Sequence, residues 1–99
     1  MNTPVRILVV DDEVGIREGC RRVLVPQGFE VDVAENGPVG LRKLRESSYD
    51  VLLLDIMMPG MSGMEVLRQA RQIDPDLICI IITGYATVEL AVQAVRSPE

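Results

Sequence analysis

The 99-residue sequence predicts an α/β domain in which helices cover both faces of a parallel sheet. Four short apolar segments alternate with four segments of helical periodicity, which is the pattern of βαβ units. Three of these segments are almost uninterrupted in apolar residues, as expected for strands covered on both faces, whereas the second alternates and suits an edge. The expected strands are 7–10, 31–34, 51–54 and 78–82.

The strand order favoured by these patterns is 2-1-3-4, that of the flavodoxin-like doubly wound sheets. This order places the fourth strand at the other edge, although its sequence, ICIII, is strongly apolar. An uncovered apolar edge invites pairing with another strand. We therefore expect a single domain over residues 1–99 that is incomplete at its C-terminal end and lacks at least one further strand.

Helix boundaries follow from local residue types. Pro26 and Gly28 end the first helix, and the second begins at the turn formed by Asn36 and the glycine after it. Ser62 is the expected N-cap of the third helix, which stops before Pro75. The residues expected to face the core are Ile16, Cys20, Val23 and Leu24 in the first helix, Leu41 and Leu44 in the second, Met64, Leu67 and Ala70 in the third, and Val88, Ala91, Val92 and Val95 in the fourth.

Composition excludes several classes of function. The net charge is −5, so the chain lacks the basic surface of a nucleic-acid binder, and we expect no direct nucleic-acid contact. The absence of histidine removes the usual zinc sites and Ser-His-Asp or Cys-His catalysis. Cys20 and Cys79 lack CxxC spacing and are expected to be buried apolar residues. With no apolar run long enough for a bilayer and no signal-peptide pattern, we expect a cytoplasmic protein without membrane contact.

Polar side chains follow three of the expected strands at their carboxyl ends. Asp11 and Asp12 follow the first strand, Asp55 follows the third, and Thr83 follows the fourth. Adjacent strands lie about 4.8 Å apart, so these side chains would stand in a row at the edge where open α/β sheets bind ligands. Crowded carboxylates repel one another and recruit a cation, and all-oxygen ligation is what Mg²⁺ prefers. Asp55 would then be the nucleophile toward a phosphoryl group. The hydroxyl of Thr83 would bind one oxygen of that phosphoryl group.

Each of these residues also has a structural interpretation. Asp11, Asp12 and Glu13 are common residue types at the start of a helix. Asp55 is a typical turn initiator, and Thr83 is a typical residue at the end of a strand. Their joint placement on three neighbouring strand ends favours a phosphorylation site.

The sequence resembles the receiver domain of bacterial two-component response regulators. The match covers essentially the whole chain, and its motifs occur in the family's order. They are ILVVDDE at 7–13, LLLDIMMPGMSGMEVL at 52–67 and IIITGYAT at 80–87. The segment TGYATVELAVQAV is most similar to the NtrC-like, sigma-54-dependent class of transcriptional regulators.

This resemblance implies roles for individual residues. Asp55 would be the phosphoacceptor, and Thr83 would be the switch hydroxyl that moves to the phosphoryl group. Asp11, Asp12 and Asp55 would hold Mg²⁺ together with the main-chain carbonyl of Met57. A histidine kinase would supply the phosphoryl group, and a separate output domain would respond to it. The chain would then be a signalling module rather than an enzyme, catalysing at most its own phosphorylation and dephosphorylation.

The sequence departs from the family at its end. Family members have a fifth strand that ends in a lysine pairing with the phosphoryl oxygens, followed by a fifth helix, and neither is present here. Lys43 is the only lysine and belongs to the second helix. We therefore expect a truncated receiver domain that self-associates through the exposed edge of the fourth strand.

Two other functions are alternatives for an α/β sheet of this kind, and the sequence favours neither. A Mg²⁺-dependent phosphohydrolase of the haloacid dehalogenase type would also form an aspartyl phosphate. Such enzymes carry the motif DxDxT, in which a second Asp lies two residues after the nucleophile, whereas the residue two positions after Asp55 is Met57. A flavodoxin-like mononucleotide binder would need a phosphate-binding loop after the first strand, where the acidic DDE sequence would repel phosphate.

Overall fold

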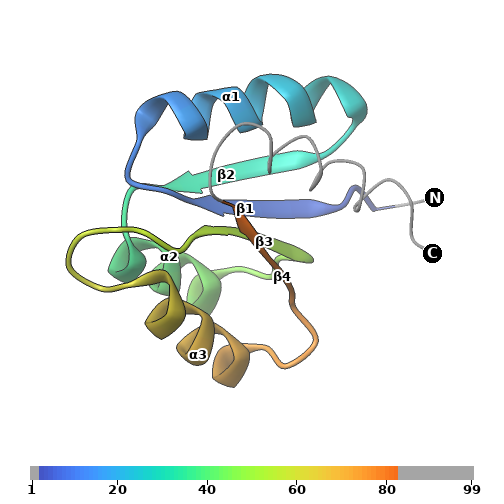
Figure 1. Cartoon of the computed structure of the whole chain (residues 1–99). Coiled ribbons are helices and arrows are strands. Elements are labelled where there is room, and N and C mark those ends of the chain that lie inside the picture. Colours follow the sequence, from blue (N-terminus) through green and yellow to red (C-terminus); the bar gives the residue numbers. More distant parts are fainter. Residues whose placement is uncertain (1–2, 83–99) are drawn as a thin grey trace.

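The computed structural model describes residues 3–82, which form a four-stranded parallel sheet with helices on both faces (Figure 1). The strands run in the order β2-β1-β3-β4, as predicted. Thr83 and the predicted fourth helix lie outside the described residues. The strands are β1 (Arg6–Val10), β2 (Glu30–Ala34), β3 (Val51–Asp55) and β4 (Ile78–Ile82).

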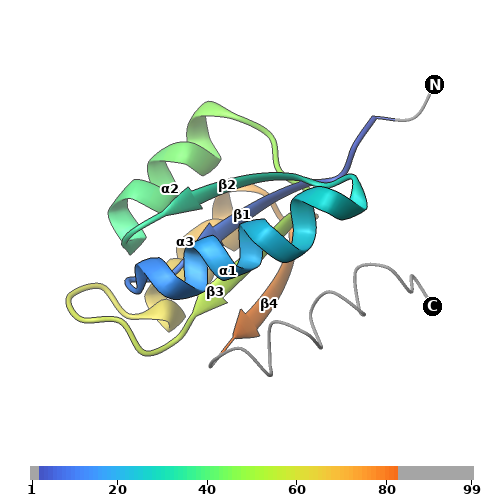
Figure 2. The same cartoon turned by 90° about the horizontal axis from the view of Figure 1, so that it is seen from above.

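The helices divide between the two faces of the sheet. Figure 1 shows α1 on one face and α2 and α3 on the other, and the view from above in Figure 2 shows α1 lying over the sheet, roughly along the direction of β1 and β2. A single 3₁₀ turn, η1, follows α1. The bounds are α1 (Val14–Leu24), η1 (Val25–Gln27), α2 (Gly37–Glu46) and α3 (Gly63–Ile73).

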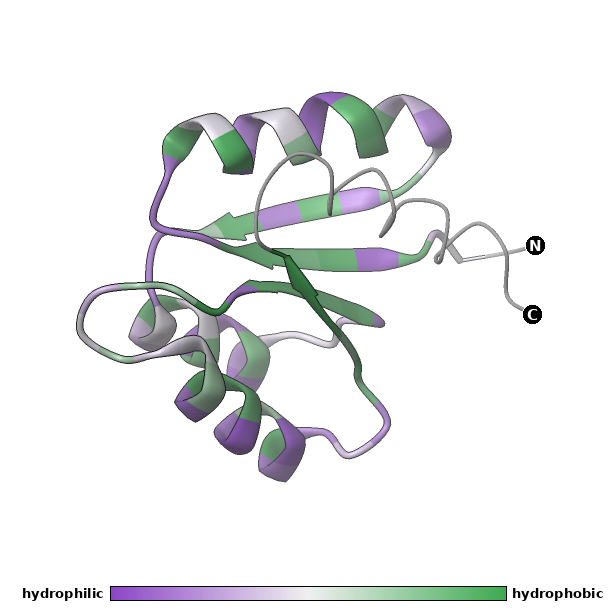
Figure 3. Ribbon diagram, in the orientation of Figure 1, coloured by the Kyte–Doolittle hydropathy of each residue, from purple (hydrophilic) through white to green (hydrophobic). Residues whose placement is uncertain are grey.

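Successive residues of the central strands enter two separate cores. Ile7 and Val9 of β1 pack toward α1, whereas Leu8 and Val10 pack toward α2 and α3, because side chains alternate between the faces of a strand. All four of these residues are fully buried. Figure 3 shows the same division, with largely apolar strands between helices that mix apolar and hydrophilic residues. The continuous apolar runs of the sequence therefore reflect burial on both faces.

The predicted helix ends are confirmed. Gly28 closes η1 with φ of 96°, a left-handed conformation that favours glycine, and its N–H bonds the carbonyl of Val25 at 3.0 Å. The side chain of Asn36 caps α2 by accepting from the N–H of Val39 at 2.9 Å. Ser62 caps α3 in the same way at 3.3 Å. These caps bind main-chain N–H groups that have no partner within the helix.

Two predicted core residues prove to be exposed. Val23 in α1 is 40% exposed and Met64 in α3 is 54% exposed. In α3 the fully buried side chains are Val66 and Ala70, with Leu67 only partly buried. The helix contacts the core through these small residues, which allow close approach, and the apolar residues of α3 extend beyond the stripe that the sheet covers.

A polar cluster joins the amino ends of the strands. The hydroxyl of Tyr49 donates to a carboxylate oxygen of Asp32 at 2.6 Å, and the guanidinium of Arg6 lies 4.8 Å from the centre of the Tyr49 ring. The N–H of Arg6 also donates to the carboxylate of Asp50 at 2.8 Å. This cluster connects β2 and the start of β3 to β1. It lies at the opposite end of the strands from Asp11, Asp12 and Asp55.

Candidate functional site

Three carboxylates meet at the carboxyl edge of the sheet. Asp11 follows β1 directly and Asp55 is the last residue of β3, the strand paired with β1. Each of Asp11, Asp12 and Asp55 has a carboxylate oxygen within 4.8 Å of the others. Asp11 and Asp55 are 4% and 8% exposed, whereas Asp12 is exposed. The structure thus brings together the three acids that the sequence predicted, although β3 includes Asp55 rather than ending before it.

The chain around Asp11 is held by contacts from three directions. Its N–H donates to the carbonyl of Ala34, which extends the pairing of β1 with β2 by one residue. Its carboxylate accepts from the N–H of Glu13 at 2.9 Å, and its carbonyl accepts from the guanidinium of Arg17 at 2.7 Å. Glu13 is the N-cap residue of α1, but its side chain makes no capping hydrogen bond. Arg17 was not among the predicted site residues. The sequence indicates it only by the placement of a basic residue about one turn into the helix that follows the acidic loop.

Asp55 is held at the end of β3 by its own loop. Its Oδ1 accepts from the N–H of Met57 at 2.9 Å, and its Cα lies in register with Ile82 of β4. In the loop that follows, Met58 is buried in the core while Met57 is 80% exposed. The Met57 side chain therefore contributes little to packing, and its main chain is the part that contacts the acid.

Burial and neighbouring charge alter the ionisation of this cluster. The pKa of Asp11 is raised to about 6, first because burial disfavours the carboxylate and then because Asp55, Asp12 and Glu13 are negative; the hydrogen bond from the N–H of Glu13 opposes the shift. In the described part of the chain no arginine or lysine forms an ion pair with these three acids. A bound cation would offset the repulsion among them.

The donor set suits a hard divalent cation. Three carboxylates within reach of one another, one of them exposed to solvent, supply oxygen ligands alone, which is the preference of Mg²⁺, and leave room for water or phosphate oxygens. Cys20 and Cys79 are both free thiols. Cys20 is buried and Cys79 partly buried, burial raises the pKa of each thiol, and neither belongs to the acidic cluster.

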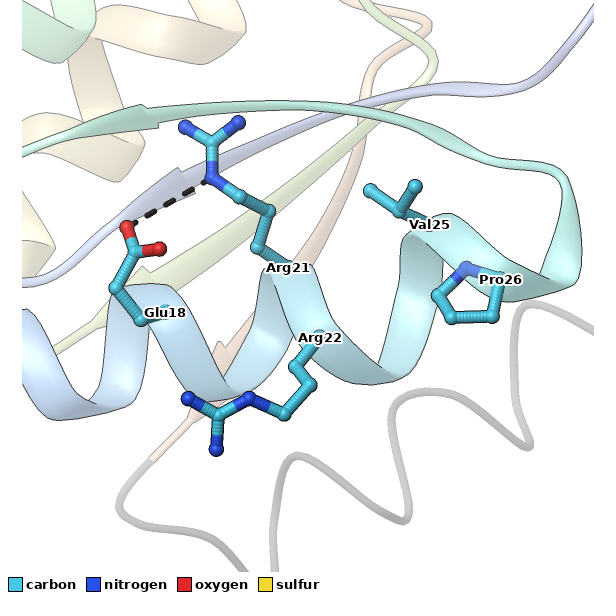
Figure 4. Close-up of a pocket in the computed structure, with 5 residues that line it drawn as sticks. All are labelled: Glu18, Arg21, Arg22, Val25 and Pro26. Atoms are coloured by element: carbon cyan, nitrogen blue, oxygen red, sulfur yellow. Dashed lines mark ion pairs between the residues drawn. The ribbon is translucent and has the colours of Figure 1, made fainter.

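A separate hollow lies on α1, away from the acids. It is lined by Glu18, Arg21, Arg22, Val25 and Pro26, with an ion pair between Arg21 and Glu18 (Figure 4). Glu18 lies near the middle of α1, Arg21 and Arg22 lie in its last turn, and Val25 and Pro26 belong to η1, whereas the acids lie where α1 begins. None of the helices in residues 3–82 has the length and apolar character needed to cross a membrane.

Sequence comparison identifies relatives among bacterial regulators. The family model for the response regulator receiver domain matches residues 7–97. The response regulator MprA of Mycobacterium sp. (strain KMS) is 41% identical over 85 residues, which cover 86% of this chain and 37% of MprA. The regulatory protein AtoC of Escherichia coli (strain K12) is 41% identical over 91 residues, which cover 92% of this chain and 20% of AtoC. The chain thus spans about a third or less of these relatives.

Structure comparison gives the same result. The response regulator protein TrrA from Thermotoga maritima, solved in complex with Mg(2+)-BeF, is 42% identical with a TM-score of 0.77, over 92% of this chain and 79% of that one. TrrA in complex with histidine kinase ThkA matches at 47% identity and a TM-score of 0.75, over 82% of this chain and 70% of that one. The likeness therefore includes both the fold and the sequence.

Proposed function

Because the chain belongs to the family of response regulator receiver domains, phosphoacceptor modules of two-component signalling, we propose that Asp55 is its phosphoacceptor. The observation that carries the proposal is the placement of Asp55. It ends a central strand beside two further acids, and one of its oxygens is held by the N–H of Met57. The other oxygen has no hydrogen bond among the described residues and is available to attack phosphorus.

The proposed reaction is a direct phosphoryl transfer. A carboxylate oxygen of Asp55 forms a bond to phosphorus while the bond from phosphorus to a histidine nitrogen of the kinase breaks, and the electron pair of that bond stays on the nitrogen. The product is an acyl phosphate on Asp55. The kinase as donor is supported by the structure of TrrA with histidine kinase ThkA.

We assign the metal to the acidic cluster. Asp11, Asp12 and Asp55 would hold Mg²⁺ through their carboxylates, with the main-chain carbonyl of Met57 as a further ligand. Bound Mg²⁺ would neutralise charge between the acids and the incoming phosphoryl group. TrrA in complex with Mg(2+)-BeF supports this choice of ion. The chain's own contribution is to hold the Asp11 loop through Arg17 and the Met57 loop through its bond to Asp55.

The response to phosphorylation is assigned to Thr83 and to an output domain. Thr83 follows Ile82 of β4, whose neighbour in register on β3 is Asp55. Its hydroxyl would bind a phosphoryl oxygen and so bias the conformation of the segment after it. Relatives such as AtoC are much longer than this chain, which supports a separate output domain. The transcriptional regulatory protein ZraR of Klebsiella oxytoca, 38% identical over 93 residues, supports an output that regulates transcription.

The test compares covalent phosphate on three forms of the 99-residue chain. The wild type, Asp55→Asn and Asp74→Asn are incubated with a small phosphodonor, with Mg²⁺ or with EDTA, and their intact masses are measured. Asp74 is a matched control because its carboxylate accepts from an N–H two residues later, as that of Asp55 does. We expect Mg²⁺-dependent phosphate on the wild type and on Asp74→Asn alone. Equal phosphate on Asp55→Asn would refute the assignment.

A further inference from the structure

Helix α3 begins directly against the main chain of the phosphoacceptor. Gly63 is its first residue, and a Cβ built there would lie 2.4 Å from the carbonyl oxygen of Asp55 and 2.5 Å from the Cα of Ile56. Side-chain carbons do not approach other atoms so closely. A side chain at this position therefore requires the main chain to move.

The obstacles at Gly63 differ from those at two other close-packed glycines. At Gly37 and Gly40 the nearest atoms to a built Cβ, at 2.7 Å, are methyl groups of Val66 and Val10. A side chain that blocks a new Cβ can rotate away or be replaced by a smaller one. The main-chain carbonyl of Asp55 can do neither. The approach at Gly63 is thus set by the path of the chain.

The main chain of Asp55 is the less movable partner. Asp55 belongs to β3, and its register with Ile82 holds it within the sheet. The start of α3 and the loop 56–62 would therefore absorb the movement. This loop is closed by a 3.3 Å hydrogen bond from the N–H of Gly63 to the carbonyl of Ile56, and it carries the Met57 N–H that binds Asp55.

We propose that Gly63 is a positioning residue for the phosphoacceptor site. Its missing side chain lets α3 start against Asp55, and this contact keeps the main chain of Met57 in place around the Asp55 carboxylate. The proposal rests on the function proposed above for Asp55 and the Met57 carbonyl. A side chain at position 63 therefore changes the site through the main chain, without contacting the carboxylate of any of the three acids.

The test uses Gly63→Ala in the 99-residue chain, with Gly40→Ala as the matched control. Both substitutions add one methyl group at a crowded position, but at Gly40 the added carbon meets the side chain of Val10, which can move, and not the main chain of Asp55. The first measurement is the NMR chemical shift of the Met57 amide proton in metal-free protein. This shift should move upfield in Gly63→Ala, as expected when the hydrogen bond from Met57 to Asp55 is lost, and stay unchanged in Gly40→Ala. This readout needs neither metal nor phosphate.

The second measurement is binding of Mg²⁺ alone to folded protein, followed by the rate of phosphate gain from a small phosphodonor. Displacing a group that orients metal ligands typically weakens metal affinity or activity by about 10- to 100-fold. We expect at least about a tenfold loss in both for Gly63→Ala and none for Gly40→Ala. A folded Gly63→Ala protein with wild-type Met57 shift and Mg²⁺ affinity would overturn the proposal.

If Gly63→Ala fails to fold, a titration of the wild type with Mg²⁺ tests the proposal instead. On titration with Mg²⁺ the amides of Met57 and Gly63 should shift together, because one closed loop joins them, while the amide of Gly40 stays in place. A shift at Met57 with none at Gly63 would overturn the proposal. Failure of the wild type to gain phosphate would instead refute the function proposed for Asp55, and the metal-free Met57 shift would still test Gly63.

Discussion

The carboxylates of Asp11 and Asp55 lie within 4.8 Å of each other at the ends of two adjacent strands, and both are almost fully buried. Two buried like charges at this separation destabilise each other unless a proton or a cation intervenes. The pair thus links the stability of the fold to pH and to metal.

Asp11→Asn should stabilise the metal-free protein at neutral pH. The pKa of Asp11 is raised to about 6 by burial and nearby acids, from an ordinary value of 3.8, so the folded state binds this proton more tightly than the unfolded chain does. The stability contributed by the protonated group is fully present below pH 4 and is lost as pH rises through 6. The asparagine keeps the oxygen that accepts from Glu13 and carries no charge.

Urea unfolding in EDTA between pH 4 and 8 measures this effect. We expect the free energy of unfolding of Asp11→Asn to exceed that of the wild type by on the order of 3 kcal/mol at pH 7 and to match it near pH 4. Asp76→Asn, at an exposed position away from the cluster, should show no such pH-dependent gain. A constant difference across the pH range would contradict the pKa shift of Asp11.

Asp12→Ala should remove the response to Mg²⁺ without altering the metal-free fold. Asp12 is exposed and makes no hydrogen bond within the described residues, so its loss should change the melting temperature in EDTA very little. Mg²⁺ should raise the melting temperature of the wild type, because a ligand that binds only the folded state stabilises it. Thermal melts with increasing Mg²⁺ should show this rise in the wild type and in Asp76→Ala. An equal rise in Asp12→Ala would exclude Asp12 as a ligand.

Tyr49→Phe should lower the free energy of unfolding by about 1 kcal/mol, the usual contribution of one hydrogen bond. The lost bond is that from the Tyr49 hydroxyl to Asp32 at 2.6 Å. Burial, followed by the bond to Asp32, raises the pKa of Tyr49 to about 12 from an ordinary 10. The stability from this group is therefore fully present below pH 10 and lost as pH rises through 12.

Urea unfolding at pH 7 measures the first effect, and absorbance of tyrosinate measures the second. The chain has two tyrosines, Tyr49 and Tyr85, so the titration of Tyr49→Phe reports Tyr85, and subtraction isolates Tyr49. Ionisation of Tyr49 near pH 10 would contradict the buried hydrogen bond.

We expect the 99-residue chain to self-associate through the edge of β4, and Ile78→Lys to reduce this association. Within residues 3–82, β4 pairs with β3 alone, and Ile78 at its start is 58% exposed. A charged residue on an exposed strand discourages pairing with another chain. Light scattering over a range of concentrations should give a mass above one chain for the wild type and for Val23→Lys, and a lower mass for Ile78→Lys. A wild-type mass of one chain at high concentration would rule out this association.

Strand order and site location could be predicted because they depend on local patterns. Continuous apolar runs identify β1, β3 and β4, alternation identifies β2 as an edge, and parallel strands bring their carboxyl ends together. Asp11, Asp12 and Asp55 therefore had to meet once the order was known. Periodicity alone could not distinguish the buried side of α3, because Met64 and Val66 are both apolar and only the position of the sheet decides which is covered.

Residue type and spacing along the chain were sufficient to predict the four strands, the first three helices, the strand order and the three acids. Packing between distant segments sets three further properties: the burial of Asp55 within β3, the raised pKa of Asp11, and the contact of Gly63 with the main chain of Asp55. These properties depend on distances between segments far apart in sequence. Such distances are set by how closely helices pack on the sheet, which residue spacing does not encode.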